Sequence, residues 1–156
     1  MTKTIIVNEN DVERVHRKPH EKYEYYKRQI TSRDQFDQLY VSIYDIPPLK
    51  ASYPFHYHVN NTEAFYIISG QGLFIGDGEE NIIRKGDVIV CPQGKEGVHK
   101  IVNTSETQML TYIDIDSTNS PDIVHYPDSK KINVIVHGES ADVYMEEDTV
   151  DYFTGE

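Results

Sequence analysis

The stretch that decides the fold reads FHYHVNNTEAFYIISG over residues 55–70. His56 and His58 are two residues apart, and on a β-strand that spacing puts both imidazoles on the same face. A short polar loop follows, which can fold Glu63 back toward the two histidines. An apolar run then predicts a second strand, which ends in a turn at Gly70.

A second stretch, GDVIVCPQGKEGVHKIVN at residues 86–103, adds a third histidine, His99. Hairpin pairing can bring residues about 40 positions apart onto one inner wall of a β-barrel. Three neutral imidazoles and one carboxylate form a good ligand set for a first-row divalent metal. Two other interpretations stay open on these residues alone. An H-x-H pair on a strand often arises by chance, and histidines inside a barrel can be hydrogen-bonded core residues.

Short apolar runs continue on both sides of these stretches. They cover residues 39–44, 73–75, 82–83, 88–90, 101–102, 109–115 and 132–136, with turn residues between several of them. Runs of β-branched and aromatic residues at a spacing of roughly 8–12 residues predict an all-β sandwich or barrel. The sequence also predicts one short helix, from Asp11 to Val15, with Asn8 or Asn10 as its cap.

Both stretches resemble the motifs of the cupin superfamily. The first family motif is roughly G-x5-H-x-H-x3,4-E-x6-G, and residues 56–70 match it without a break. The second is roughly G-x5-P-x-G-x2-H-x3-N, and residues 86–103 match its residue types and order. This chain departs from the pattern at two places. Lys50 stands where the first motif opens with glycine, and the gap from Gly94 to His99 is two residues longer than the common form.

The resemblance implies an all-β fold, the double-stranded β-helix or jelly-roll barrel of the cupins. It also implies that one divalent metal ion (Fe, Mn, Ni, Zn or Co) is held by four residues: His56, His58, Glu63 and His99. Four protein ligands leave about two positions open on an octahedral ion for substrate or water. The other motif residues are then turn or strand-end positions: Gly70, Gly86, Pro92, Gly94 and Asn103.

The resemblance further implies a small metalloenzyme that acts on a small polar molecule, similar to sugar-phosphate isomerases or dioxygenases. One fold hosts many chemistries, so a non-catalytic, small-ligand-binding or sensory cupin is the alternative, and a structural or storage role is a third. A phosphosugar substrate needs cations near the metal, and the candidates by position in the sequence are Lys50, Arg84, Lys95 and Lys100. Four further histidines are expected to lie outside the site: His16, His20, His125 and His137.

Length and composition narrow the class of protein and its partners. A chain of 156 residues has room for one domain. Its net charge of −11 argues against nucleic acid and against an anionic membrane surface as binding partners, because both carry negative charge themselves. No apolar run approaches the roughly 18 residues that span a bilayer, and we expect no signal peptide and a cytoplasmic location. The single cysteine, Cys91, excludes an intrachain disulfide and is expected to be a buried structural thiol.

The chain is expected to have three parts. Residues 1–36 form an N-terminal extension, with a strand that packs on the barrel or on a dimer partner. Residues 37–137 form the cupin barrel. Residues 138–156 form an acidic C-terminal segment, with seven Asp or Glu and no Lys or Arg.

Aromatic residues in the two terminal parts lead to two further predictions. The expected N-terminal strand has an apolar edge that one barrel cannot fully cover, formed by Tyr23, Tyr25 and Tyr26. We therefore expect a homodimer. Tyr152 and Phe153 interrupt the acids near the C-terminus, whereas purely disordered acidic tails are poor in aromatic residues. Part of the tail is therefore expected to dock on the domain through these two rings.

Overall fold

The computed structural model describes residues 3–32, 36 and 38–156. These residues form strands and two short 3-10 turns, Glu9–Asp11 and Lys95–Gly97, and they form no α-helix. The strands are β1 (Arg14–His20), β2 (Tyr23–Gln29), β3 (Leu39–Ile46), β4 (Tyr57–His58), β5 (Glu63–Ser69), β6 (Gln71–Ile75), β7 (Glu80–Arg84), β8 (Val88–Cys91), β9 (Lys100–Val102), β10 (Leu110–Ser117), β11 (Asp122–Tyr126), β12 (Lys131–Val136) and β13 (Ser140–Met145). The prediction of an all-β chain is confirmed. Among the described residues, no helix is long and apolar enough to cross a membrane.

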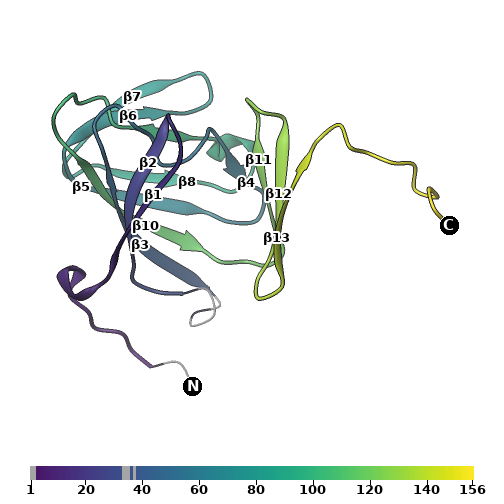
Figure 1. Ribbon diagram of the computed structural model, residues 1–156, viewed down its shortest axis with the longest axis horizontal. Helices are drawn as coiled ribbons and strands as arrows, with labels where there is room; N and C mark the ends of the chain where they lie inside the picture. The colour runs from purple at the N-terminus through teal and green to yellow at the C-terminus, as the bar shows by residue number, and fades with distance from the viewer. Residues whose placement is uncertain (1–2, 33–35, 37) are drawn as a thin grey trace.

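The strands form three antiparallel sheets around one barrel (Figure 1). The largest has the order β1-β2-β3-β10-β5-β8, the second β13-β12-β11-β4, and the third β7-β6-β9. Isolated bridges from Ala51 to Val102 and from His56 to His99 join segments of different sheets. This arrangement confirms the predicted double-stranded β-helix, or jelly-roll, barrel.

Strand β10 divides the barrel interior into an apolar end and a polar end. Alternate side chains of this strand are buried: Leu110, Tyr112, Asp114 and Asp116. The first two belong to the hydrophobic core, together with buried residues of β3, β5, β7, β8 and β9. The two aspartates lie beside Glu63, which pairs with Asp116 across the ladder between β10 and β5. The polar end of the barrel is therefore the place where a site can form.

The N-terminal hairpin, β1 and β2, extends the six-stranded sheet beside β3. The ring of Tyr25 packs 5.5 Å from the ring of Tyr44, and Tyr26 stacks on His16 at 4.5 Å. These tyrosines are half-buried against residues of their own chain. They therefore do not form the exposed edge on which the expected homodimer was based.

The predicted helix from Asp11 to Val15 is wrong. Asn8 does act as a cap, because its side chain accepts a hydrogen bond from the Asn10 amide at 3.0 Å, but the cap starts only the 3-10 turn Glu9–Asp11. Strand β1 begins at Arg14, and Val15 pairs with Lys27 of β2. Pairing with a neighbouring strand overrides the local helix signal here.

The acidic C-terminal segment leaves the barrel as an arm (Figure 1). Its first part forms β13, which pairs with β12 along its whole length, and every residue of β13 is exposed. The expected docking of Tyr152 and Phe153 on the domain is wrong. Their side chains are 88% and 72% exposed, and the two rings pack edge-to-face on each other.

Asn103 is fully buried, and its amide ties three backbone groups together. Its Nδ2 group donates to the carbonyls of Ile46 at 2.8 Å and Gln108 at 2.7 Å, and its Oδ1 accepts from the Ser105 amide at 2.9 Å. We predict that Asn103→Ala lowers the free energy of unfolding by about 2–4 kcal/mol, because three backbone groups, one of them in a buried hydrogen bond, lose their partner. Urea denaturation measures this change.

The matched control is Asn81→Ala, because Asn81 is exposed on β7. That change is expected to alter the free energy of unfolding by less than about 0.5 kcal/mol. Equal effects of the two substitutions would show that the buried amide does not stabilise the fold.

Candidate metal centre

A pair of backbone hydrogen bonds places two of the predicted ligands side by side. The His56 amide donates to the His99 carbonyl at 3.0 Å, and the His99 amide donates to the His56 carbonyl at 2.8 Å. The two rings lie 4.7 Å apart, centroid to centroid. His58 is on β4, with its ring 5.5 Å from that of His56, and Glu63 is the first residue of β5.

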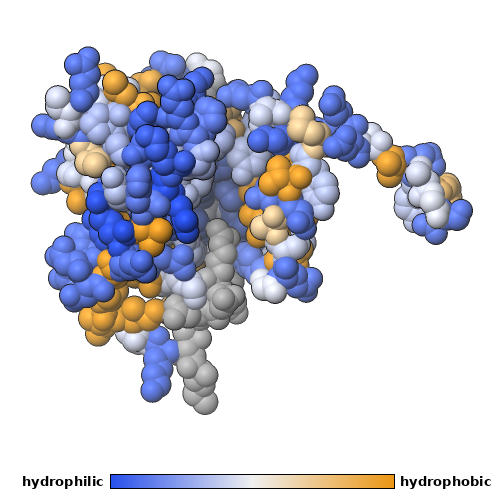
Figure 2. All heavy atoms as spheres, in the orientation of Figure 1, coloured by the Kyte–Doolittle hydropathy of each residue, from blue (hydrophilic) through white to orange (hydrophobic). Residues whose placement is uncertain are grey.

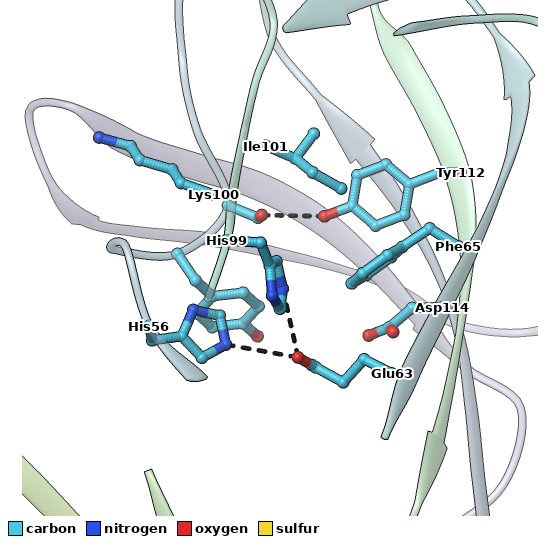
Figure 3. Close-up of a pocket in the computed structure, with 10 residues that line it drawn as sticks. His56, Glu63, Phe65, His99, Lys100, Ile101, Tyr112 and Asp114 are labelled. Carbon is cyan, nitrogen blue, oxygen red and sulfur yellow. Dashed lines mark hydrogen bonds and ion pairs between the residues drawn. The ribbon is translucent and has the colours of Figure 1, made fainter. Parts of the chain in front are cut away.

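The three imidazoles converge on the carboxylate of Glu63, and Figure 3 shows this for His56 and His99. The Oε2 atom of Glu63 lies 3.2 Å from Nε2 of His99 and 3.7 Å from Nε2 of His56, and its Oε1 atom lies 3.6 Å from Nε2 of His58. Two donor atoms that are both about 2.1 Å from one ion lie about 3.0–3.4 Å apart. The distances from Glu63 to the three histidines are thus close to what a single ion requires, and the ligand atoms of His56, His58 and Glu63 all lie within 4.8 Å of one another.

The other ring nitrogen of each histidine is held by an acceptor. His56 Nδ1 donates to the Pro54 carbonyl at 2.8 Å, and His99 Nδ1 donates to the Gly97 carbonyl at 2.9 Å. A carbonyl oxygen only accepts, so these Nδ1 atoms carry the proton and the Nε2 lone pairs face Glu63. Such contacts orient metal-binding imidazoles and fix their tautomer, so the residues present fit a metal ion.

Electrostatics keep two of the imidazoles neutral. Burial lowers the pKa of His99 to about 4. Burial, with the nearby charges of His99 and His58, also lowers the pKa of His56 well below its ordinary value. At His58 burial acts the same way, but the hydrogen bond to Asp122 and the charge of Glu63 outweigh it and raise the pKa. Two ligands are therefore ready to bind a cation at neutral pH, and the third can bind once it loses its proton.

The longer gap before His99 is taken up by a 3-10 turn, Lys95–Gly97. A Cβ atom at Gly97 would lie 1.8 Å from the carbonyl oxygen of Pro92, so no other residue fits there without a backbone shift. The Gly97 carbonyl in turn holds the His99 ring. The two extra residues therefore leave His99 beside Glu63.

Sequence reasoning missed Asp122, the first residue of β11. This fully buried carboxylate accepts a hydrogen bond from His58 Nδ1 through Oδ2 and one from the Asn60 amide, at 3.0 Å, through Oδ1. Burial opposes its ionisation, but the hydrogen bonds from His58 and Asn60 lower its pKa. No motif surrounds Asp122, and its place beside His58 follows only from the pairing of β11 with β4.

A cavity of about 170 Å³ adjoins the cluster, and His56, His58 and Glu63 line it. Asp114 and Asp116 line it too. Burial and the charges of Asp116 and Glu63 raise the pKa of Asp114 well above its ordinary value. Both aspartates could have been suspected from the sequence, because they occupy inward positions of an otherwise apolar strand. Four tyrosines add hydroxyl groups to the lining: Tyr40, Tyr44, Tyr53 and Tyr126.

Lys27 of β2 also lines this cavity, and it is a cation that sequence reasoning missed. Its ammonium lies 4.9 Å and 5.0 Å from the ring centroids of Tyr40 and Tyr44. The four cationic residues suggested by sequence position do not line this cavity. Lys50 donates to the Glu21 carbonyl at 2.7 Å, the ammonium of Lys100 points away from Glu63 (Figure 3), and Arg84 and Lys95 are exposed residues outside the lining.

The remaining histidines and the cysteine lie outside the cluster. His125 stacks on Tyr57, and its Nδ1 lies 3.0 Å from Oε1 of Glu146. His16 contacts Glu24 at 3.1 Å on the N-terminal hairpin. Cys91 is buried at the end of β8, and burial raises the pKa of its thiol to about 12. A thiol in this state is inert rather than nucleophilic.

Comparison with known proteins concerns the domain that carries these residues. The sequence profile of the Cupin domain matches residues 42–116, which contain both motifs. No curated protein matches the chain significantly in sequence.

Several solved structures share the barrel at low sequence identity. A sugar phosphate isomerase of the cupin superfamily from Silicibacter pomeroyi has a TM-score of 0.80 and 15% identity, over 93% of this chain and 95% of that chain. A protein provisionally named a sugar phosphate isomerase, from Acidithiobacillus ferrooxidans, has a TM-score of 0.78 and 21% identity, over 91% and 90%. A predicted oxalate decarboxylase from Thermotoga maritima has a TM-score of 0.65 and 22% identity, over 74% and 100%. The profile match shows a Cupin domain at residues 42–116, and the solved structures share the fold of the barrel that contains it.

Proposed function

We propose that the protein is a metal-dependent enzyme of the sugar-phosphate isomerase type, with one divalent ion held by His56, His58, Glu63 and His99. The convergence of three Nε2 atoms on one carboxylate carries this proposal, because each matching Nδ1 atom already has a partner. Imidazole and carboxylate donors suit Fe, Mn, Ni, Zn or Co. A bound ion of this kind supplies Lewis acidity toward a substrate oxygen.

The polar groups around the cluster favour proton transfer over oxygen chemistry. Isomerisation of a sugar moves a proton between neighbouring carbon atoms, so it needs a group that accepts a proton and returns it. Asp114 lies beside Glu63, lines the cavity and is placed for that role. Lys27 can bind the anionic end of a substrate, and the tyrosine hydroxyls can bind its hydroxyl groups. Two structures with a similar barrel are named sugar phosphate isomerases, one of them provisionally.

The first test concerns the metal. His99→Ala removes one of four donors, so we predict that bound metal per chain falls sharply, as measured by elemental analysis after loading with each candidate metal. His125→Ala is the control, because that ring lies away from the cluster, and it is expected to keep the metal. If His125→Ala lost the metal as fully as His99→Ala, the ligand assignment would be wrong.

A second test concerns Asp122. Asp122→Asn removes the charge that orients His58, so we predict a 10–100-fold loss of metal affinity, roughly the effect of losing such a contact elsewhere. Competition with a chelator measures the affinity. Asp128→Asn, at an exposed turn position, is the matched control and is expected to leave the affinity unchanged. An unchanged affinity in Asp122→Asn would mean that His58 needs no such support.

The reaction itself is tested with metal-loaded protein and a panel of aldose phosphates in D₂O. Isomerisation should carry deuterium onto the carbon beside the carbonyl, and Asp114→Asn should abolish this exchange while the metal stays bound. Lys27→Gln should raise KM for the phosphorylated sugar, because the phosphate loses its cation. Oxygen consumption without deuterium exchange would favour a dioxygenase, and binding without turnover would favour a sensory cupin.

A further inference from the structure

Glu63 also belongs to a second group of side chains that can hold a cation. One carboxylate oxygen from each of Glu63, Asp114 and Asp116 lies within 4.8 Å of the other two, and all three residues are buried. Figure 3 shows the carboxylate of Asp114 turned toward Glu63. These three residues are called the carboxylate cluster below.

Two paired strands hold the carboxylate cluster in place. Asp116 lies directly opposite Glu63 in the ladder between β10 and β5, so both side chains point to the inner face of the sheet. Asp114 precedes Asp116 by two residues on β10 and therefore points to the same face. The strand register thus brings the three acids together and fixes their positions.

Buried oxygen atoms near the cluster have no hydrogen-bond partner among the described residues. They are Oδ1 of Asp114, Oγ of Ser42 and Oδ1 of Asn133. Ser42 is fully buried and lies opposite Asp114 in the ladder between β10 and β3, so its hydroxyl is on the same inner face. Asn133 lines the same cavity as Asp114. Buried polar atoms of this kind need a partner from outside the chain.

The charge and chemistry of the cluster favour a hard cation as that partner. Three carboxylates lie together, and Lys27 contributes one positive charge to the cavity. Burial of carboxylates costs free energy unless opposite charge or hydrogen bonds compensate it. The histidine cluster offers mainly nitrogen, whereas this cluster offers only oxygen, which Ca²⁺ and Mg²⁺ prefer.

The spacing of the cluster suits an ion of the size of Ca²⁺. Calcium–oxygen distances of about 2.3–2.6 Å let two ligands on opposite sides of the ion lie up to about 5 Å apart. This range covers the 4.8 Å within which the three oxygens lie. Magnesium–oxygen distances of about 2.0–2.1 Å limit the same separation to about 4.2 Å. The larger ion therefore makes the weaker demand on the three side chains.

We propose that the carboxylate cluster is a second cation site, which binds Ca²⁺ through Glu63, Asp114 and Asp116. Glu63 has two carboxylate oxygens, so it can face this ion and the ion of the histidine cluster at the same time. Calcium binding does not depend on the proposed function. Its effect on activity does rest on that function, because the cation occupies Asp114, the group that we propose as proton acceptor, and should therefore inhibit isomerisation.

The test is a calorimetric titration of the full chain, loaded first with one equivalent of Zn²⁺ and then titrated with Ca²⁺. Zinc accepts imidazole nitrogen, so it is expected to take the histidine cluster. The wild type should then bind one equivalent of Ca²⁺. Asp116→Asn keeps the shape of the side chain but removes its charge, so the affinity for Ca²⁺ should fall at least about tenfold while Zn²⁺ stays bound.

His99→Ala separates this proposal from the proposed function. The variant lacks one ligand of the histidine cluster and none of the carboxylate cluster, so it should lose Zn²⁺ and keep the equivalent of Ca²⁺. Loss of both ions would show that they share one site and would overturn the proposal. Calcium binding by a wild type that takes up no Zn²⁺ would refute the proposed function and support the second site.

The matched control addresses the acids at the surface. Residues 138–156 carry seven Asp or Glu, and Figure 2 shows this arm extending away from the barrel. Asp142→Asn removes an exposed acid of β13 and should leave calcium binding unchanged. The wild-type titration needs no variant, so it tests the proposal even if Asp116→Asn fails to fold. A wild type without calcium binding, unchanged affinity in folded Asp116→Asn, or an equal loss in Asp142→Asn would each overturn the proposal.

Discussion

The two reciprocal backbone hydrogen bonds between His56 and His99 are the contact on which the fold and the candidate site both depend. His56 comes just before β4 and His99 just before β9, so the bonds join two sheets that are otherwise separate in their ladders. The same bonds hold the two imidazoles 4.7 Å apart. The same contact therefore closes the barrel and brings two residues of the candidate site together, and a change that opens this bridge would affect both.

Strand β10 shows how one alternating strand serves two purposes. Its inward positions begin with Leu110 and Tyr112, which pack in the core, and end with Asp114 and Asp116, which enter the cavity. Buried carboxylates cost free energy unless they find partners or a cation. The apolar end of the strand contributes the burial that offsets this cost. The barrel can therefore keep an acidic interior at one end without losing its core.

The sequence was sufficient for the barrel and for the gathering of the four predicted ligands, since motif spacing and strand alternation are local signals. It was not sufficient for Asp122 or Lys27, which reach the site through pairing with strands distant in the chain. The mistaken helix at residues 11–15 also comes from strand pairing, here within one hairpin, because a good cap at Asn8 is overruled by pairing between β1 and β2. Pairing with another strand, near or distant in the chain, is therefore what the residues of one segment cannot reveal.

Because Cys91 is buried, chemical labelling of its thiol can report local opening of the structure. Cys91 holds the only thiol of the chain, on the strand next to Glu63, with which it pairs in the ladder between β5 and β8. A thiol with a pKa of about 12 is almost entirely protonated at neutral pH, and burial keeps reagents away from it. Alkylation by a thiol reagent thus requires the packing around the end of β8 to open. The labelling rate then measures how often the neighbourhood of Glu63, the central carboxylate of the candidate site, opens to solvent.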